Sequence, residues 1–206
     1  MIKNLLFDLG GVIMDIEKDR CVEAFVRLGL PDAPSYFGEY SQKGPFMVLE
    51  EGAISTDDFH RSLRADIGRE VSDSEIDHAF CQFLTGIPSH RLAELRKLRG
   101  HYRIFLLSNT NPIMWDTKIR DEFTKEGRTR EDYFDGMVTS FEARSLKPDE
   151  KIFRYAEEQL GIVPEETIFL DDSQRNLDAA LRLGFHTLLV PPGSEFATLL
   201  AAEGIK

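Results

Sequence analysis

The sequence predicts a three-layer α/β fold, in which a parallel sheet lies between two layers of helices and a helical cap is inserted into the core. Short apolar runs alternate with segments of helical periodicity through most of the chain. One early segment, residues 17–86, breaks this alternation because it holds helical segments and no comparable apolar run. The 206 residues are enough for one such core with a small inserted module.

Five apolar runs are typical of buried parallel strands, because each is short, continuous and bounded by turn residues. They are Ile2–Phe7, Arg103–Leu107, Gly136–Ser140, Thr167–Leu170 and His186–Val190. Between the later runs, apolar residues recur three or four positions apart, which indicates helices packed on the sheet. These helices are expected at His90–Arg99, Glu150–Leu160 and Gln174–Leu183. The expected core is therefore a Rossmann-like parallel sheet formed by residues 1–16 and 87–206.

The expected cap comprises residues 17–86. Helical periodicity is clear at Arg20–Leu28, Asp57–Ile67 and Asp73–Leu84, whereas residues 31–52 are rich in Pro, Gly, Tyr and Phe and are less regular. Ser55 and Asp58 have the spacing of an N-terminal capping box. A cap of this kind would close over the strand ends, exclude water and select the substrate.

Composition excludes several classes of protein. A net charge of -11 argues against a nucleic-acid or anionic-membrane surface, so an anionic ligand must be attracted by a local cation. Cys21 and Cys81 are too few for a disulfide framework and too far apart for a CxxC pair. The N-terminus lacks the features of a signal peptide, and no apolar stretch reaches the ~20 residues that span a bilayer. We expect a cytoplasmic protein, and the sequence does not determine its oligomeric state.

Polar residues follow four of the expected strands. They are Asp8, Ser108 with Asn109, Lys147, and Asp171 with Asp172. Because the carboxyl ends of parallel strands meet at one edge of a sheet, these side chains should lie together. Three carboxylates, one ammonium and a hydroxyl suit the joint binding of Mg²⁺ and a phosphate.

The order and spacing of these residues resemble the four motifs of the haloacid dehalogenase superfamily, over nearly the whole chain. The motifs here read FDLGGV from Phe7, LLSNTN from Leu106, LKPD from Leu146 and FLDDS from Phe169. A helical insert between the first and second motifs fits the same superfamily. The forms FDLGGVIMDIE, LLSNTN and LKPDEKIF are most similar to a branch of bacterial sugar-phosphate phosphatases that includes an α-glucose-1-phosphate phosphatase.

This resemblance implies a Mg²⁺-dependent phosphatase for a small phosphorylated metabolite, with a sugar phosphate such as glucose 1-phosphate favoured. Asp8 would attack phosphorus and form an aspartyl phosphate. Mg²⁺ would be held by Asp8, the backbone carbonyl of Gly10 and Asp172, with Asp171 sharing the ligation or acting through water. Mn²⁺ or Ca²⁺ could occupy the same oxygen ligands.

The same resemblance assigns the groups that bind the phosphate. Ser108 and the backbone N–H of Asn109 would bind phosphoryl oxygens. Lys147 would neutralise developing charge and keep Asp8 ionised and oriented. Arg20, at the start of the insert, is a further candidate for contact with the substrate, and a solvated helix position is the alternative.

One departure from the family pattern concerns the general acid. The position two residues after the nucleophile usually holds an Asp that protonates the leaving group, but here it is Gly10. Loss of a general acid typically costs about 10²–10⁴-fold in rate. An anomeric sugar oxygen needs less help in leaving than a simple alkoxide. Asp15, in the expected flap after the first strand, is a candidate replacement.

Three other functions stay open on the sequence. A 2-haloacid dehalogenase of the same superfamily also uses an Asp nucleophile but needs no metal, so Asp171 and Asp172 count against it. A phosphotransferase or mutase shares every motif. A weakly catalytic protein that binds a phosphorylated ligand would also explain Gly10.

Overall fold

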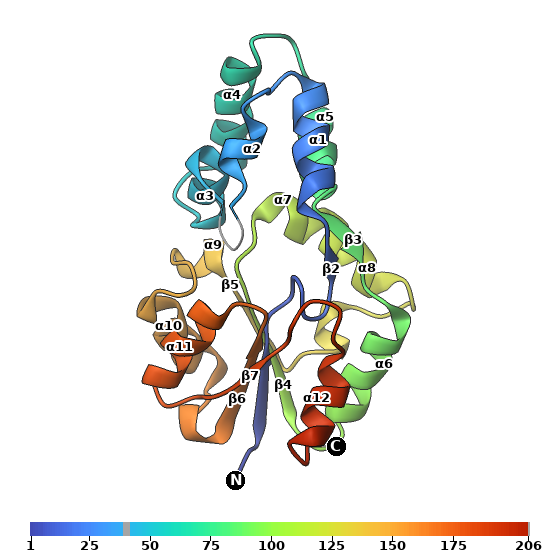
Figure 1. Cartoon of the computed structure of the whole chain (residues 1–206), viewed down its shortest axis with the longest axis vertical. Helices are drawn as coiled ribbons and strands as arrows, with labels where there is room; N and C mark the ends of the chain where they lie inside the picture. The colour runs from blue at the N-terminus through green and yellow to red at the C-terminus, as the bar shows by residue number, and fades with distance from the viewer. Residues whose placement is uncertain (39–41, 206) are drawn as a thin grey trace.

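The computed structural model describes residues 1–38 and 42–205, which form two lobes (Figure 1). One lobe is an α/β core that contains both chain ends, and the other is a group of helices above the core. Within the described residues, no helix has the length and apolar character needed to cross a bilayer. The predicted fold class is confirmed.

Five parallel strands form the core sheet, in the order β5-β4-β1-β6-β7. They are β1 (Asn4–Phe7), β4 (Arg103–Ser108), β5 (Gly136–Thr139), β6 (Thr167–Asp171) and β7 (His186–Leu189). Each strand lies on one of the predicted apolar runs and differs from it by no more than two residues at either end. In the register, Phe7 pairs with both Leu106 and Leu170. Asp8 therefore leaves the sheet between the ends of β4 and β6.

Successive residues of each strand face opposite helical layers. Leu6 packs in a cluster with residues of α10 (Glu150–Leu160) and α11 (Gln174–Arg182). Phe7 packs on the other face with α6 (Ser89–Leu98) and α12 (Phe196–Ala202), and its ring centroid lies 5.2 Å from that of Phe196. Figure 1 shows these two helical layers on either side of the sheet. Because both faces are covered, the strands are continuously apolar rather than alternating.

Short elements complete the core between the strands. After β4 the chain forms α7 (Pro112–Met114), a π-helical segment (Trp115–Ile119) and α8 (Arg120–Thr124). Two 3₁₀ turns, Arg130–Asp132 and Pro164–Glu166, precede β5 and β6. The helix α9 (Ser140–Ala143) follows β5 directly and lies at the edge of the core that faces the cap.

The cap consists of α1 (Lys18–Leu28), α2 (Ala33–Tyr36), α3 (Gly44–Glu50), α4 (Thr56–Ile67) and α5 (Asp73–Cys81). It has its own aromatic core, in which the Phe46 ring lies 5.1 Å from the rings of both Phe25 and Phe80. Ser55 caps α4 by accepting a hydrogen bond from the Asp58 N–H at 3.1 Å. The predicted capping residue is confirmed.

A two-stranded antiparallel ribbon joins cap and core. Its strands are β2 (Asp15–Ile16) and β3 (Leu84–Gly86). The predicted helix over Asp73–Leu84 is too long, because α5 ends at Cys81 and Leu84 begins β3. A strand of three residues is too short to produce a periodic pattern, and its pairing with β2 decides its conformation. The ribbon lies where the sequence places the domain boundaries, although the division into two domains stays a prediction.

Candidate active site

The predicted polar residues meet at the carboxyl edge of the core sheet. Asp8 directly follows β1, Ser108 ends β4 and Asp171 ends β6. Lys147 comes from the loop after α9. The parallel register of β1, β4 and β6 places these ends beside one another.

The ammonium of Lys147 lies between two carboxylates. Its Nζ is 2.8 Å from Asp8 Oδ1 and 2.8 Å from Asp171 Oδ2, and its side chain is 1% exposed. Burial lowers the pKa of Lys147, but the neighbouring Asp171 and Asp8 carboxylates more than offset this effect and hold the pKa above its usual value. Lys147 is therefore a buried permanent cation that is fixed by two hydrogen-bonded counter-charges.

Asp171 is fully buried, and both of its carboxylate oxygens accept hydrogen bonds. Oδ1 accepts from the Ser173 N–H at 2.8 Å, and the Asn176 amide donates to both oxygens at 3.0 and 3.1 Å. These contacts hold Asp171 in place beside Lys147. Direct contact of Asp171 with a metal stays a prediction. Sequence reasoning missed Asn176, whose position in the first turn after the acidic pair was the available signal.

Asp8, Asp171 and Asp172 each place a carboxylate oxygen within 4.8 Å of the others. Burial, together with repulsion from Asp171 and Asp172, raises the pKa of Asp8 to about 7 despite the attraction of Lys147. Burial and repulsion from Asp171 raise the pKa of Asp172 to about 6. A cluster of three oxygen donors that repel one another fits a hard divalent cation, which would remove the repulsion.

Gly11 makes room for this cluster. Its φ is +77°, and a Cβ on Gly11 would lie 2.3 Å from Asp172 Oδ2. Any other residue at position 11 would both strain the backbone and displace the carboxylate. Gly11 therefore makes room for the Asp172 carboxylate as well as forming the turn.

Asn109 fixes the loop that carries Lys147. Its Oδ1 accepts from the Lys147 N–H at 2.9 Å, and its Nδ2 donates to the Lys147 carbonyl at 3.1 Å. Ser108 is 2% exposed, and its hydroxyl makes a long contact of 3.4 Å with the Asn109 carbonyl. Phosphate binding by Ser108 and by the Asn109 N–H stays a prediction.

A cavity of about 130 Å³ adjoins these residues. The ribbon strand β2 contributes Ile16, and the segment from the cap to β3 contributes Gly38, Gln42, Glu50 and Phe83. The core contributes Asp8, Gly10, Asn109, Leu146, Lys147, Asp172, Ser173 and Asn176. Lys147 is the sole cationic side chain among the described residues that line this cavity. Sequence reasoning missed Gln42 and Glu50, because no motif marks them and only the folded cap brings them to the site.

The structure contradicts the hypothesis that Asp15 replaces the missing acid. Ile16 lines the cavity, and Asp15, its neighbour on β2, points the other way. The Asp15 carboxylate instead accepts a hydrogen bond from Arg91 at 2.7 Å, outside this cavity.

Arg20 does not line the cavity either. Its side chain is 52% exposed and donates to Gln82 at 3.2 Å. The alternative expectation, a solvated helix position, describes its surroundings, and substrate contact by Arg20 stays a prediction.

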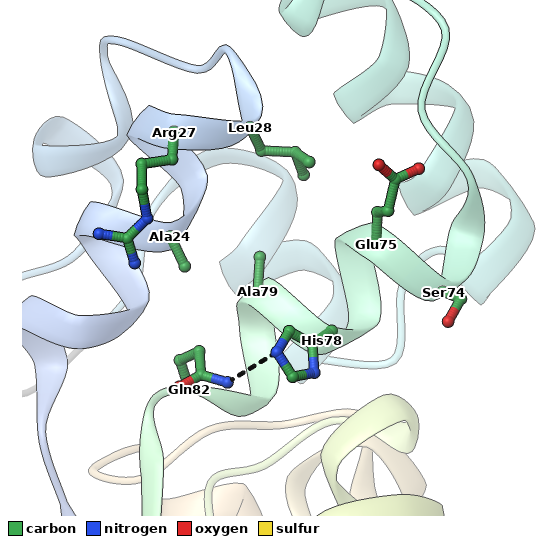
Figure 2. A pocket seen from close by; sticks show the side chains of 8 residues that line it. All are labelled: Ala24, Arg27, Leu28, Ser74, Glu75, His78, Ala79 and Gln82. Carbon is green, nitrogen blue, oxygen red and sulfur yellow. Dashed lines mark hydrogen bonds between the residues drawn. The ribbon is translucent and has the colours of Figure 1, made fainter.

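A second hollow lies within the cap, between α1 and α5 (Figure 2). Its wall includes Ala24, Leu28 and Ala79, and a hydrogen bond of 3.2 Å joins His78 to Gln82 at its edge. This hollow is larger than the cavity at Asp8, at about 560 Å³, but it contains none of the clustered carboxylates. The candidate active site is therefore identified by the residues that line its cavity and not by the volume of the cavity.

The fold and the site together define a class of protein with a Rossmann-like α/β core, an inserted helical cap and a carboxylate cluster at the carboxyl edge of the sheet. A family model of haloacid dehalogenase-like hydrolases matches residues 2–184. The chain belongs to this family, and the predicted family and hydrolase class are confirmed.

Similar proteins of known sequence or structure cover almost the whole chain. A D-ribitol-5-phosphate phosphatase of Bacteroides thetaiotaomicron is 38% identical over 95% of both chains. The crystal structure of a HAD family enzyme from the same organism, in complex with magnesium and inorganic phosphate, superposes with a TM-score of 0.90 at 38% identity and covers 97% of this chain and 99% of that one. A predicted HAD-like hydrolase from Porphyromonas gingivalis is 34% identical, with a TM-score of 0.92 over 100% and 99% of the two chains.

Proposed function

We propose that this protein is a Mg²⁺-dependent phosphatase that hydrolyses a small sugar or polyol phosphate. The observation that carries the proposal is the buried Lys147, held between Asp8 and Asp171 beside Asp172, in a cavity roofed by the cap. The relative that is named a D-ribitol-5-phosphate phosphatase, and the magnesium and phosphate in the related crystal, support it.

Asp8 and Asp172 would hold Mg²⁺ together with the backbone carbonyl of Gly10, which also lines the cavity. When bound, the cation offsets the negative charge of the phosphate and of the carboxylates. The all-oxygen donor set is the one that Mg²⁺ prefers.

Asp8 is the nucleophile in this proposal. Its Oδ1 accepts a hydrogen bond from the Leu9 N–H at 2.7 Å and lies 2.8 Å from Lys147 Nζ. These contacts orient the carboxylate, so that one of its oxygens would attack phosphorus while the other would contact the cation. Attack would form an aspartyl phosphate and release the alcohol, and water would then hydrolyse this intermediate.

The identity of the alcohol is constrained by Gly10. Because residue 10 has no proton to give, an anomeric oxygen such as that of glucose 1-phosphate is a favourable leaving group. D-Ribitol 5-phosphate, the substrate in the relative's name, would release a primary alkoxide. Both compounds belong in the first substrate panel.

The test is phosphate release from sugar, polyol, nucleotide and carboxylic-acid phosphates, with Mg²⁺ or with chelator. We expect Asp8→Asn to lower kcat by at least about 10³-fold, because no other group can accept the phosphoryl group. Asp19→Asn, at an exposed position on α1, should behave as the unmodified protein.

Three results would contradict the proposal. Phosphate release that persists in chelator and in the Asp8→Asn variant would exclude the metal-dependent mechanism with Asp8 as nucleophile. Metal-independent chloride release from 2-haloacids would favour a dehalogenase, and transfer to an acceptor sugar without free phosphate would favour a phosphotransferase.

A further inference from the structure

Glu50 faces the proposed active site from the cap. It is the last residue of α3, is 8% exposed and lines the same cavity as Asp8 and Lys147. Gln42, just before α3, is 9% exposed and also lines this cavity. The phosphate-binding chemistry described above uses neither residue.

One polar atom on the wall of this cavity is buried without a partner. Within residues 1–38 and 42–205, Gln42 Oε1 has no hydrogen-bond partner. Buried polar groups in proteins are nearly always hydrogen-bonded, so an unpaired acceptor on a cavity wall indicates a ligand that donates a hydrogen bond to it.

The Glu50 carboxyl is suited to an uncharged ligand. Burial raises the pKa of Glu50 to about 8, although a hydrogen bond with the Asn111 side chain lowers it in part. Near neutral pH the group is therefore largely a carboxylic acid, which can donate one hydrogen bond and accept others. A hydroxyl group has the same two capacities.

The position of Glu50 is fixed by contacts with the core. Its backbone carbonyl accepts a hydrogen bond of 2.6 Å from the Ser140 hydroxyl. Ser140 also accepts from the Thr110 N–H at 3.0 Å, which ties the end of α3 to the loop after β4. Glu50 is therefore held in place on the wall of the cavity.

The charge of the cavity excludes a second anion. Among the described lining residues, Lys147 is the sole cation, and it is already paired with Asp8 and Asp171. Because Lys147 and a bound Mg²⁺ would serve the reacting phosphate, an additional carboxylate or phosphate on the substrate would have no further cationic side chain to compensate it.

We propose that Glu50 and Gln42 form a hydroxyl-binding subsite that selects the uncharged polyol or sugar portion of a phosphate monoester. This inference rests on the proposed phosphatase function and adds its substrate determinants. The subsite favours leaving groups with several hydroxyls and disfavours those with a second negative charge.

The experiment compares each hydroxylated substrate with a counterpart that lacks hydroxyls and has the same kind of leaving oxygen: D-ribitol 5-phosphate with pentyl phosphate, and glucose 6-phosphate with cyclohexylmethyl phosphate. 3-Phosphoglycerate tests the second charge. The variants are Glu50→Leu, Glu50→Gln and Gln42→Leu. Glu51→Leu is the matched control, since Glu51 is the next residue, is partly exposed and is absent from the cavity wall.

Of the two hydroxylated substrates, the one that is hydrolysed faster should exceed its counterpart by at least about tenfold in kcat/KM in the unmodified protein. The reason is that the counterpart leaves the polar groups of the subsite without hydrogen-bond partners. Glu50→Leu should lower kcat/KM for that substrate by about 10- to 100-fold and for the counterpart by less than about threefold. Glu50→Gln, which still donates and accepts, should retain most of the preference, and Glu51→Leu should retain all of it.

An equal loss on both members of a pair would overturn the subsite and leave the phosphatase function standing. Turnover of 3-phosphoglycerate at the rate of the best sugar or polyol phosphate would also overturn the subsite. If Glu50→Leu does not fold, the losses of kcat/KM on the two members of each pair are compared in Gln42→Leu instead. Absence of phosphate release from every compound would instead overturn the proposed function, and the subsite with it.

Discussion

Lys147 and Gly11 determine the geometry of the site at the scale of single residues. Lys147 neutralises part of a three-carboxylate cluster, and both of its carboxylate neighbours are within 2.8 Å. Gly11 has an opposite role, because the space left by its missing side chain is filled by Asp172. One residue supplies charge and the other supplies room, and the cluster needs both.

Gly11→Ala should impair metal binding as well as stability. The change combines an unfavourable φ of +77° with a Cβ placed 2.3 Å from Asp172 Oδ2, so the carboxylate must move. Gly127→Ala is the control, because Gly127 has a similar φ of +71° but open space around the added Cβ.

We expect both alanine variants to lose about 1 kcal/mol of stability from backbone strain. Only Gly11→Ala should also raise the Mg²⁺ concentration for half-maximal activity, by about tenfold or more. Metal titrations of phosphate release measure this, and equal Mg²⁺ requirements in the two variants would contradict the role of Gly11.

At the scale of elements, the contact between α3 and α9 sets the position of the cap. Ser140 on α9 donates to the Glu50 carbonyl, and Gly52, just after α3, lies against the backbone of Phe141. A Cβ on Gly52 would lie 2.1 Å from the Phe141 carbonyl oxygen. Backbone atoms cannot step aside as a flexible side chain can. The cap and the core therefore approach each other closely only because residue 52 has no side chain.

Gly52→Ala should push the cap away from the core. Gly68→Ala is a matched control, because both glycines have a φ of +69° and Gly68 has no atom within 4 Å of the added Cβ. We expect Gly52→Ala to lower kcat/KM by about 10- to 100-fold, since small displacements of binding groups have effects of this size. Gly68→Ala should lose some thermal stability but keep its kcat/KM. Equal activities of the two folded variants would show that this contact does not position the cap.

At the scale of the whole molecule, the clustered carboxylates make stability depend on a cation. Asp8, Asp171 and Asp172 repel one another, in a chain whose net charge is already -11. A ligand that binds only the folded state stabilises it by mass action. The site that serves catalysis in our proposal therefore also couples metal binding to folding.

Mg²⁺ should raise the melting temperature. At about 100 times the Kd, the gain is about 2.7 kcal/mol, which corresponds to roughly 5–10 °C for a chain of this size. Asp172→Asn should lose this gain and should not be less stable than the unmodified protein in chelator, because it removes one of the repelling carboxylates. Asp178→Asn, on the exposed side of α11, should keep the gain.

The measurement is thermal unfolding in MgCl₂, in chelator and in NaCl of equal ionic strength. A melting temperature that responds equally to MgCl₂ and NaCl would indicate general screening rather than a site. The same would follow if Asp172→Asn and Asp178→Asn responded alike.

Much of the core was predictable because its signals are local. The five apolar runs correspond to β1, β4, β5, β6 and β7, and the expected helix over Glu150–Leu160 matches α10 residue for residue. The errors lie in the connection between cap and core. The ribbon strand β3 was missed and α5 was predicted too long, because a strand of three residues carries no periodic pattern. Asp15 was considered as a candidate for the missing general acid, although strand alternation places Ile16 at the cavity instead.

The sequence by itself determined the family, the parallel core and the set of Asp8, Lys147, Asp171 and Asp172, because strand order and motif spacing place strand ends at one edge of a sheet. Only the tertiary structure decided how these groups are arranged. It showed Lys147 shared between Asp8 and Asp171, Asn176 holding Asp171, and Glu50 and Gln42 facing the cavity. Those arrangements depend on packing between segments far apart in the chain, and the spacing of residues along a sequence carries no information about which distant surfaces will meet.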